Sequence, residues 1–316
     1  MSTRRALMKR QRPNHDVGCV SDMCVDLILR GNVRPRFRQI EQLIGDYLLE
    51  VGGSSNIFAS QFVKLGGTCS VIGAVGKDPF GIFLLDALAR TGVDIARVRS
   101  DPRIKTGLGT ALVEGEDRAI LTYTGSIDAA RRTDLTDELA ASVRHWHIAS
   151  YFLMPRLMPF WRTWIRRLRA HGVTVSLDCN WDPDERWIGV RELLPLVDVF
   201  LPNTAEARAI SGEHDLRRAG AALAASGALV AIKRGGDGAI AFHRGRTWRG
   251  AVPAAIARRL RVVDTIGAGD SFDGGFLRAW LLKRPIDECL ALGIRCGAAS
   301  LSAAGGLTSQ LRERVA

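Results

Sequence analysis

The segment with the clearest chemical potential spans residues 262–276 and reads VVDTIGAGDSFDGGF. We expect a short strand to lead into Gly267, Ala268 and Gly269, with Asp270 following at the start of a helix. Small residues let backbone N–H groups approach a phosphate closely, and a helix N-terminus adds a favourable dipole. A carboxylate beside such an anion hole can accept a hydroxyl proton and orient the oxygen for in-line attack. The segment therefore predicts phosphoryl transfer.

Asp270 also has a simpler interpretation, because most aspartates at helix N-termini only cap the helix. Capping alone requires neither three small residues before the carboxylate nor the later Gly274 and Gly275, which permit close approach of another segment. We therefore favour the catalytic interpretation.

Two stretches resemble the signature motifs of one family. The overall resemblance to that family covers nearly the whole chain. Residues 264–276 (DTIGAGDSFDGGF) resemble the C-terminal signature of the ribokinase-like, or phosphofructokinase B-type, carbohydrate kinases, and residues 52–66 (GGSSNIFASQFVKLG) are similar to their N-terminal signature. The resemblance implies an ATP-dependent sugar kinase with an α/β, ribokinase-like fold, in which helices flank a mostly parallel central sheet and a small β lid is appended. It implies that Asp270 is the catalytic base and that the amides of Gly267, Ala268 and Gly269 stabilise the transferring phosphoryl group.

On the nucleotide side, two further segments match the family's pattern. Asn203 and Glu206 fall on its N-x-x-E motif and would act on Mg²⁺ through the ion's water shell, because Mg²⁺ keeps several of its waters. The simpler alternative is that Glu206 only favours the start of a helix. In the KRGGDG segment, Gly235 and Gly238 match the nucleotide-phosphate loop and Lys233 would touch the phosphates, although a plain hairpin turn also explains the segment.

The acceptor side is assigned in the same way. Asp26 falls on the family's first-strand aspartate that holds substrate hydroxyls, and Gly52, Gly53 and Asn56 fall on residues that line the same pocket. A carboxylate accepts hydrogen bonds from adjacent hydroxyls, which suits a sugar. Asp22 lies four residues earlier and is an alternative contact, and a solvent-exposed Asp26 without function is the simplest alternative.

Two other polar residues are secondary candidates. Asn180 belongs to a D-x-N segment that resembles one near the phosphates and the acceptor in the family. Asp264 falls on a residue that helps to hold a monovalent cation such as K⁺ in many relatives. Residues 300–310 read SLSAAGGLTSQ and depart from the usual hydroxyl and arginine pattern, which leaves potassium activation open.

Three other functions compete with a sugar kinase. Nucleoside kinases share the fold, and an aromatic slot for a base could come from Tyr47, Phe58, Tyr151 or Phe152. A non-catalytic sugar- or nucleotide-binding regulator would be expected to lose the base, the glycines or the N-x-x-E motif, and none is lost. A nucleic-acid binder would show a basic stripe interleaved with aromatics. The one such region, residues 161–169, is better explained as a helix packed on the sheet.

The order of the expected elements supports a parallel sheet with crossover helices, because strands and helices alternate. Residues 13–316 are expected to form one kinase domain after a basic, disordered tail at 1–12. Residues 16–29 are expected to form one buried strand. Two excursions, at approximately 30–51 and 105–124, are expected to form the lid, through which a homodimer could assemble.

Composition sets the remaining bounds. The chain has 316 residues, 47% hydrophobic and 24% charged, which is close to the globular average. Its net charge is +11, but only six of the 44 basic residues are lysine, so pervasive arginine enrichment explains the charge as well as a nucleic-acid surface does. We expect no nucleic-acid or membrane partner, a cytoplasmic location, and six reduced core cysteines.

Overall fold

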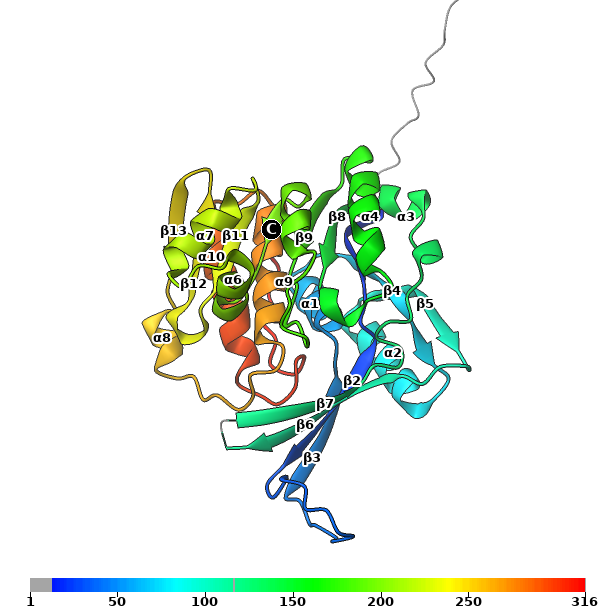
Figure 1. The fold of residues 1–316 in the computed structure, drawn as a ribbon. Coiled ribbons are helices and arrows are strands. Elements are labelled where there is room, and N and C mark those ends of the chain that lie inside the picture. The colour runs from blue at the N-terminus through cyan, green and yellow to red at the C-terminus, as the bar shows by residue number, and fades with distance from the viewer. Residues whose placement is uncertain (1–12, 116, 316) are drawn as a thin grey trace, which may run out of the picture.

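The computed structural model describes residues 13–115 and 117–315, so the predicted disordered tail at 1–12 lies outside the described residues. Within them, helices lie on both sides of a large sheet and a second, smaller sheet projects from one end (Figure 1). No helix in this part of the chain is both long and apolar enough to cross a membrane.

The larger sheet of the described residues has nine strands in the order β13-β12-β11-β10-β9-β8-β1-β4-β5. Neighbouring strands are parallel except around β12, which is antiparallel to β11 and β13. The expected mostly parallel sheet is therefore confirmed. Its strands are β1 (His15–Val20), β4 (Cys69–Gly76), β5 (Asp94–Asp101), β8 (Val143–Ile148), β9 (Thr174–Leu177), β10 (Val199–Phe200), β11 (Leu229–Lys233), β12 (Ala239–His243) and β13 (Arg246–Gly250).

Each face of this sheet has its own hydrophobic core. One core packs under α1 (Ser54–Lys64), α2 (Pro79–Thr91), α9 (Ala268–Leu281) and α10 (Ile286–Ser300). The other packs under α3 (Asp137–Ala141), α4 (Met158–Ala170), α5 (Val190–Leu193), α6 (Thr204–Ser211) and α7 (Leu216–Ala224). The short α8 (Ala254–Ala257) buries none of its residues. All six cysteines are buried and free, as expected.

The second sheet has the order β3-β2-β6-β7 and contains both excursions that the sequence predicted. Its strands are β2 (Cys24–Arg30), β3 (Asp46–Val51), β6 (Gly107–Glu114) and β7 (Asp117–Tyr123). The sheet places Asp26 of β2 between Glu50 of β3 and Gly109 of β6.

The single strand predicted for residues 16–29 is wrong. The chain forms β1, leaves the main sheet at residues 21–23 and re-forms as β2 in the second sheet. Asp22 lies at this break, and its carboxylate accepts the amide hydrogens of Ser54 at 2.9 Å and Ser55 at 3.0 Å. These bonds hold the break against the first turn of α1, a tertiary contact that a continuous apolar run does not reveal.

The short strand predicted before Gly267 is also absent. Val262 and Val263 are 60% and 44% exposed, and Val263 donates one backbone hydrogen bond, to Leu301. This stretch therefore lacks the neighbouring strand that its valines would need to form a sheet ladder. No element was predicted for residues 94–101 or 137–141, where the chain forms β5 and α3.

Candidate active site

A cavity of about 770 Å³ opens where the second sheet faces the carboxyl ends of the main strands. In open parallel sheets this edge is where ligands bind. Its lining comes from residues 22–26, 53–57, 109–127, 150–153, 178–181, 203–206, 233–238, 252, 260–272 and 294–301, though not from every residue in each range. Another cavity, of about 860 Å³, lies between α7 and the β12–β13 turn and is lined by none of the predicted site residues.

The N-terminus of α9 forms one wall of the 770 Å³ cavity. Gly267, Ala268, Gly269 and Asp270 all line the cavity. Gly267 has φ of 72°, and a β-carbon there would lie 2.9 Å from Ile57, so glycine is required for both conformation and space.

Asp270 is 8% exposed and stands in the first turn of α9. Burial and the neighbouring Asp178 carboxylate raise the pKa of Asp270 to about 7, although Lys233 acts in the opposite direction. A carboxyl group with a pKa near neutrality is well matched to general-base work at neutral pH.

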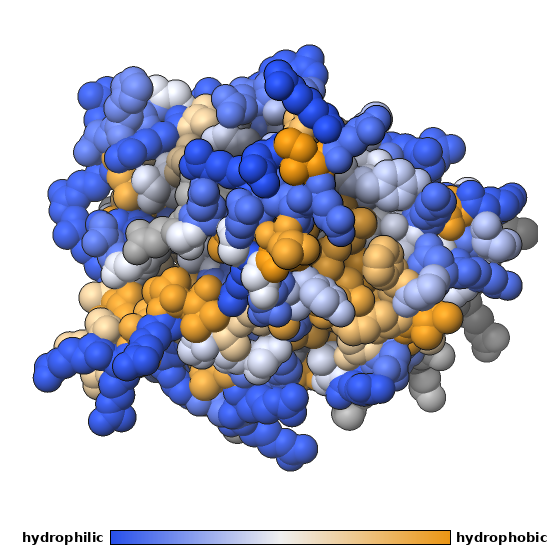
Figure 2. Space-filling view, turned by 90° about the horizontal axis from the view of Figure 1, so that it is seen from below, coloured by the Kyte–Doolittle hydropathy of each residue, from blue (hydrophilic) through white to orange (hydrophobic). Residues whose placement is uncertain are grey.

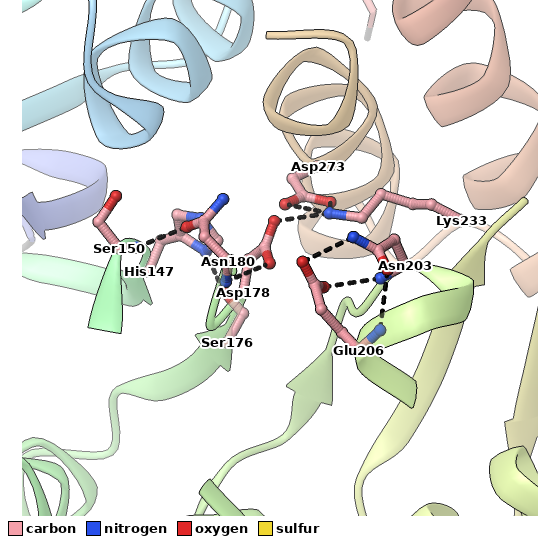
Figure 3. Close-up of polar contacts among 9 residues, drawn as sticks. All are labelled: His147, Ser150, Ser176, Asp178, Asn180, Asn203, Glu206, Lys233 and Asp273. Atoms are coloured by element: carbon pink, nitrogen blue, oxygen red, sulfur yellow. Dashed lines mark hydrogen bonds and ion pairs between the residues drawn. The ribbon is translucent and has the colours of Figure 1, made fainter. Parts of the chain in front are cut away.

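Lys233 at the end of β11 occupies the centre of a buried charge cluster (Figure 3). Its Nζ lies 2.6 Å from Asp178 Oδ2 and 3.3 Å from the carboxylate oxygens of Asp273. Although burial by itself lowers the pKa of Lys233, Asp178 and Asp273 raise it above its ordinary value. A β-carbon on Gly269 would lie 3.4 Å from Nζ, so the ammonium group is beside the predicted anion hole.

Asn203 and Glu206 meet at the start of α6 as a reciprocal capping box. Glu206 accepts from Asn203 N at 2.8 Å and from Asn203 Nδ2 at 2.6 Å, while Glu206 N donates to Asn203 Oδ1 at 2.9 Å. These contacts are those of a residue pair that starts a helix, as in the simpler interpretation of Glu206. Glu206 is nevertheless buried in the cavity wall, and burial together with Asp178 raises its pKa to about 7.

The region around Glu206 also offers oxygen ligands for a metal ion. Asp178, Cys179 and Glu206 place one ligand atom each within 4.8 Å of one another. Burial raises the pKa of the Cys179 thiol well above its ordinary value, so it remains a neutral thiol and a poor ligand for Mg²⁺. The two carboxylates fit Mg²⁺, which prefers oxygen ligands and keeps several waters.

The structure separates the roles of the two candidate acceptor aspartates. Asp22 is 3% exposed, and besides the two amides of α1 it accepts from Ser150 Oγ at 2.6 Å. Asp26 is half-buried in the cavity wall. A β-carbon on Gly52 or on Gly109 would lie 2.5 Å or 2.6 Å from Asp26 Oδ1, so a side chain at either position would displace this carboxylate.

Asn56, Gly52 and Gly53 shape the pocket in different ways. Asn56 is fully buried, donates to Gly52 O at 2.9 Å, accepts from Ser21 Oγ at 2.5 Å and does not line the cavity. Gly53 lines it with φ of 85° and leaves no room for a β-carbon, which would lie 2.3 Å from Asp22 O. Asn56 therefore supports the glycine pair from behind.

The remaining predicted residues lie in two loops. Gly235 and Gly238 follow β11, line the cavity and have φ of 55° and 78°. Asp264 is buried and accepts from Ile266 N at 3.0 Å and from Gly305 N at 3.1 Å. It therefore ties the segment before Gly267 to the C-terminal segment.

The sequence analysis missed three residues of the site: Asp273, Gly109 and Trp181. Asp273 is three residues after Asp270 and so shares a face of α9 with it, a spacing that could have revealed it. Gly109 and Trp181 reach the cavity only through the fold. The aromatic residues suggested for a base slot, Tyr47, Phe58, Tyr151 and Phe152, do not line the cavity, whereas Trp181 does.

Comparison with known proteins agrees with this geometry. Residues 14–313 match the model of the pfkB family carbohydrate kinases. The chain is 30% identical to a fructokinase of Escherichia coli over 82% of this chain and 88% of that protein. It shares its fold with an adenosine kinase of Sinorhizobium meliloti (TM-score 0.82, 23% identity, 94% and 97% of the chains). The same holds for a candidate ribokinase II of E. coli in complex with ATP and Mg²⁺ (TM-score 0.82, 23% identity, 94% and 96%). The chain belongs to the pfkB family of carbohydrate kinases.

Proposed function

We propose that this kinase transfers the γ-phosphate of ATP to a hydroxyl of a small carbohydrate, with Asp270 as the general base. The observation that carries the proposal is the position of Asp270, a buried carboxyl with a pKa raised to about 7, at the N-terminus of α9. A screen of sugars, sugar phosphates and nucleosides for acceptor-dependent ADP formation tests it. ADP formation that no acceptor stimulates would contradict it.

Each of the site residues has its own role in phosphoryl transfer. Asp270 accepts the hydroxyl proton while the acceptor oxygen attacks phosphorus, and Asp26 orients neighbouring hydroxyls. The amides of Gly267, Ala268 and Gly269 donate to the transferring group, and an oxyanion donor of this type stabilises a transition state by about 3 to 4 kcal/mol. Lys233 places positive charge beside these amides. Mg²⁺, held near Asp178 and Glu206, would neutralise phosphate charge.

The role of Glu206 can be tested by its amide variant. Glu206→Gln keeps an oxygen that can accept from Asn203 but removes the charge that would order the water shell of Mg²⁺. We expect the Mg²⁺ concentration for half-maximal rate to rise by about tenfold or more, as for other residues that act on a metal indirectly. Glu138→Gln in the first turn of α3, away from the cavity, is the matched control. An unchanged Mg²⁺ titration would mean that Glu206 only starts the helix.

A nucleoside acceptor is the second candidate, and one observation favours it. Trp181 is 49% exposed and lines the cavity, so it offers an aromatic face to a base. The acceptor screen separates this candidate from a sugar.

We also propose that the second sheet is a lid over the acceptor end. Asp26, Gly109 and Thr122 line the cavity from three of its strands. A cover matters to a kinase because water at the γ-phosphate competes with the acceptor. Deleting residues 33–42 between β2 and β3 should therefore raise the ratio of ATP hydrolysed to acceptor phosphorylated. An unchanged ratio, measured as phosphate released per acceptor phosphorylated, would exclude the lid role of this loop.

The same sheet is our proposed dimer surface. Figure 2, which looks from below, shows hydrophobic patches bordered by hydrophilic residues. Phe37, Leu121 and Tyr123 are exposed. Arg34 lies 2.5 Å from Glu114, which lessens its repulsion of a second copy, and Val51 is buried in the core. Because deleting residues 33–42 removes the exposed side chains of Phe37 and Ile40, it should also weaken dimerisation. A wild-type chain that sediments as a monomer would overturn the dimer.

A further inference from the structure

The cavity of about 860 Å³ lies at the opposite end of the strands from the site of Asp270. β11 begins at Leu229, two residues after Gly227 in the wall of this cavity, and ends at Lys233 in the wall of the other. Its five residues span about 13 Å at ~3.3 Å per residue. β13 is the last strand at this edge of the main sheet (Figure 1). The two cavities share no lining residue and are separate spaces.

The end of α7 leaves this space open because its residues here are small. A β-carbon on Gly220 would lie 2.2 Å from the ring of Phe242, so the backbone of α7 lies close over β12. Beside this contact, the residues that line the cavity have side chains too short to fill the space toward β13: Ala221, Ala224 and Ala225. One wall of the cavity is therefore apolar.

The strand β13 presents charge to the same space. Thr247 pairs with Phe242 and Arg249 pairs with Ile240, and both of these partners belong to the core under α7. Directly paired residues of neighbouring strands point to the same face of a sheet. Thr247 and Arg249 are therefore on the α7 side of the sheet, where β12 carries apolar residues.

The lining of the cavity is rich in positive charge. Four of its twelve lining residues are arginine, whereas arginine makes up 38 of the 316 residues of the chain. They are Arg217 of α7, Arg244 of the β12–β13 turn, and Arg246 and Arg249 of β13. No aspartate or glutamate of the described residues lines the cavity. The enrichment is therefore local and exceeds the arginine content of the chain as a whole.

Three of these arginines have guanidinium groups that are available to a ligand. In the part of the chain that the structure describes, the exposed side chains of Arg217, Arg244 and Arg249 make no ion pair and no hydrogen bond. The carboxylate of Asp215 at the start of α7 instead accepts the amide hydrogen of Arg217 at 3.1 Å. A guanidinium group offers five N–H donors in a planar fork that matches the oxygens of a phosphate or a carboxylate.

We propose that this cavity binds a small organic anion, with its apolar body against Phe242 and the alanines of α7. Its phosphate or carboxylate group is held by Arg217, Arg244 and Arg249. The volume of about 860 Å³ is within the ~300 to 1,000 Å³ of small-molecule sites. Single-stranded nucleic acid fits less well, because its bases stack on exposed aromatic side chains. Phe242, the only Phe, Tyr or Trp among the described lining residues, is 5% exposed.

Isothermal titration with three anions tests the charge and the apolar body separately. The anions are 1-naphthyl phosphate, phthalate and inorganic phosphate, of which the last has charge but no apolar body. We expect a ring-bearing anion to bind with a Kd below about 1 mM and at least ~tenfold more tightly than inorganic phosphate, because the ring buries apolar surface. Tighter binding of naphthyl phosphate assigns the site to phosphates, and tighter binding of phthalate assigns it to carboxylates. No saturable binding of either ring-bearing anion, or equally tight binding of inorganic phosphate, overturns the proposal.

Variants of the cavity show where the anion binds. Arg249→Ala and Arg217→Ala should each weaken binding at least ~tenfold, since each removes a charged hydrogen-bond donor. Ala221→Trp fills the cavity but keeps every arginine, and it should weaken binding by at least as much. Arg166→Ala, at an exposed position of α4 on the same side of the sheet, is the matched control and should leave the Kd unchanged.

Three results of these titrations would overturn the proposal. An unchanged Kd in Arg249→Ala, Arg217→Ala and Ala221→Trp would place the anion elsewhere on the protein. An equal loss in Arg166→Ala would mean diffuse attraction by the charge of the whole chain. A single-stranded oligonucleotide that binds more tightly than both ring-bearing anions, and loses affinity in Arg249→Ala, would assign the surface to nucleic acid. None of these variants changes a residue of the Asp270 site, so the outcome is independent of the proposed kinase function.

Discussion

Asp270→Asn is expected to lower kcat by ~10² to 10⁴-fold, the usual cost of removing a general base, while nucleotide binding persists. Asparagine fills the same space in the first turn of α9 but cannot accept the hydroxyl proton. A variant that keeps more than about a third of the wild-type kcat would contradict the assignment, because a capping residue alone has no such role.

The pH profile provides an independent readout of the same residue. Because burial and Asp178 raise the pKa of Asp270 to about 7, the active, ionised form is lost as the pH falls below that value. The kcat/KM of the wild type should therefore fall about tenfold per pH unit on the acid side. The asparagine variant should lack this limb.

In Asp270→Asn, the stability of the fold should rise although the activity falls. The raised pKa of Asp270 means that folding disfavours its charged form. This cost is fully present above the folded pKa of about 7 and disappears as the pH falls toward the ordinary carboxyl value near ~4. Asp270→Asn should therefore raise the Tm of the nucleotide-free protein at pH ~8, as expected where a site sacrifices stability for function. A lower Tm together with a lower kcat would indicate misfolding instead.

Lys233→Met is expected to destabilise the fold by about 3 to 5 kcal/mol, the cost of leaving buried charges without their partner. Asp178 and Asp273 are almost completely buried and would face each other without the intervening ammonium. They would then tend to share a proton, so the variant should regain stability as the pH is lowered. Urea denaturation at two pH values measures both effects.

Two controls make the Lys233 result specific. Arg90→Met removes an exposed partner of Asp86, and pairs of this kind contribute only about 0 to 1 kcal/mol. Lys233→Met combined with Asp273→Asn should recover part of the loss because Asp178 then no longer lies beside a second buried carboxyl group. A Lys233→Met variant within ~0.5 kcal/mol of the wild type would mean that the buried cluster contributes little to folding.

The elements that the sequence predicted well are those with strong local signals. The glycine-rich approach to Asp270 carries helix-start signals in adjacent residues, and the predicted excursion at 105–124 contains β6 and β7. The second sheet was predicted as two excursions from the same core. By contrast, the break between β1 and β2 depends on Asp22 binding the first turn of α1, which lies more than thirty residues away in sequence.

The site was predicted only where a motif reports it directly. Asp270, Glu206 and Lys233 all line one cavity. The sequence did not reveal that Lys233 is held by two carboxylates, because Asp178, Lys233 and Asp273 come from three distant segments. Gly109 was missed for a similar reason, since its need for glycine arises from the cross-strand carboxylate of Asp26.

The most direct test of the central claim is the stoichiometry of the reaction itself. Purified enzyme is mixed with Mg²⁺, ATP and the best acceptor of the screen, and ADP, inorganic phosphate and phosphorylated acceptor are quantified by mass spectrometry and phosphorus NMR. The account predicts that ADP and phosphorylated acceptor form in equal amounts with little free phosphate. It also predicts that both products fall together in Asp270→Asn. ADP formed with free phosphate in place of phosphorylated acceptor, or an Asp270→Asn variant that forms phosphorylated acceptor at the wild-type rate, would contradict it.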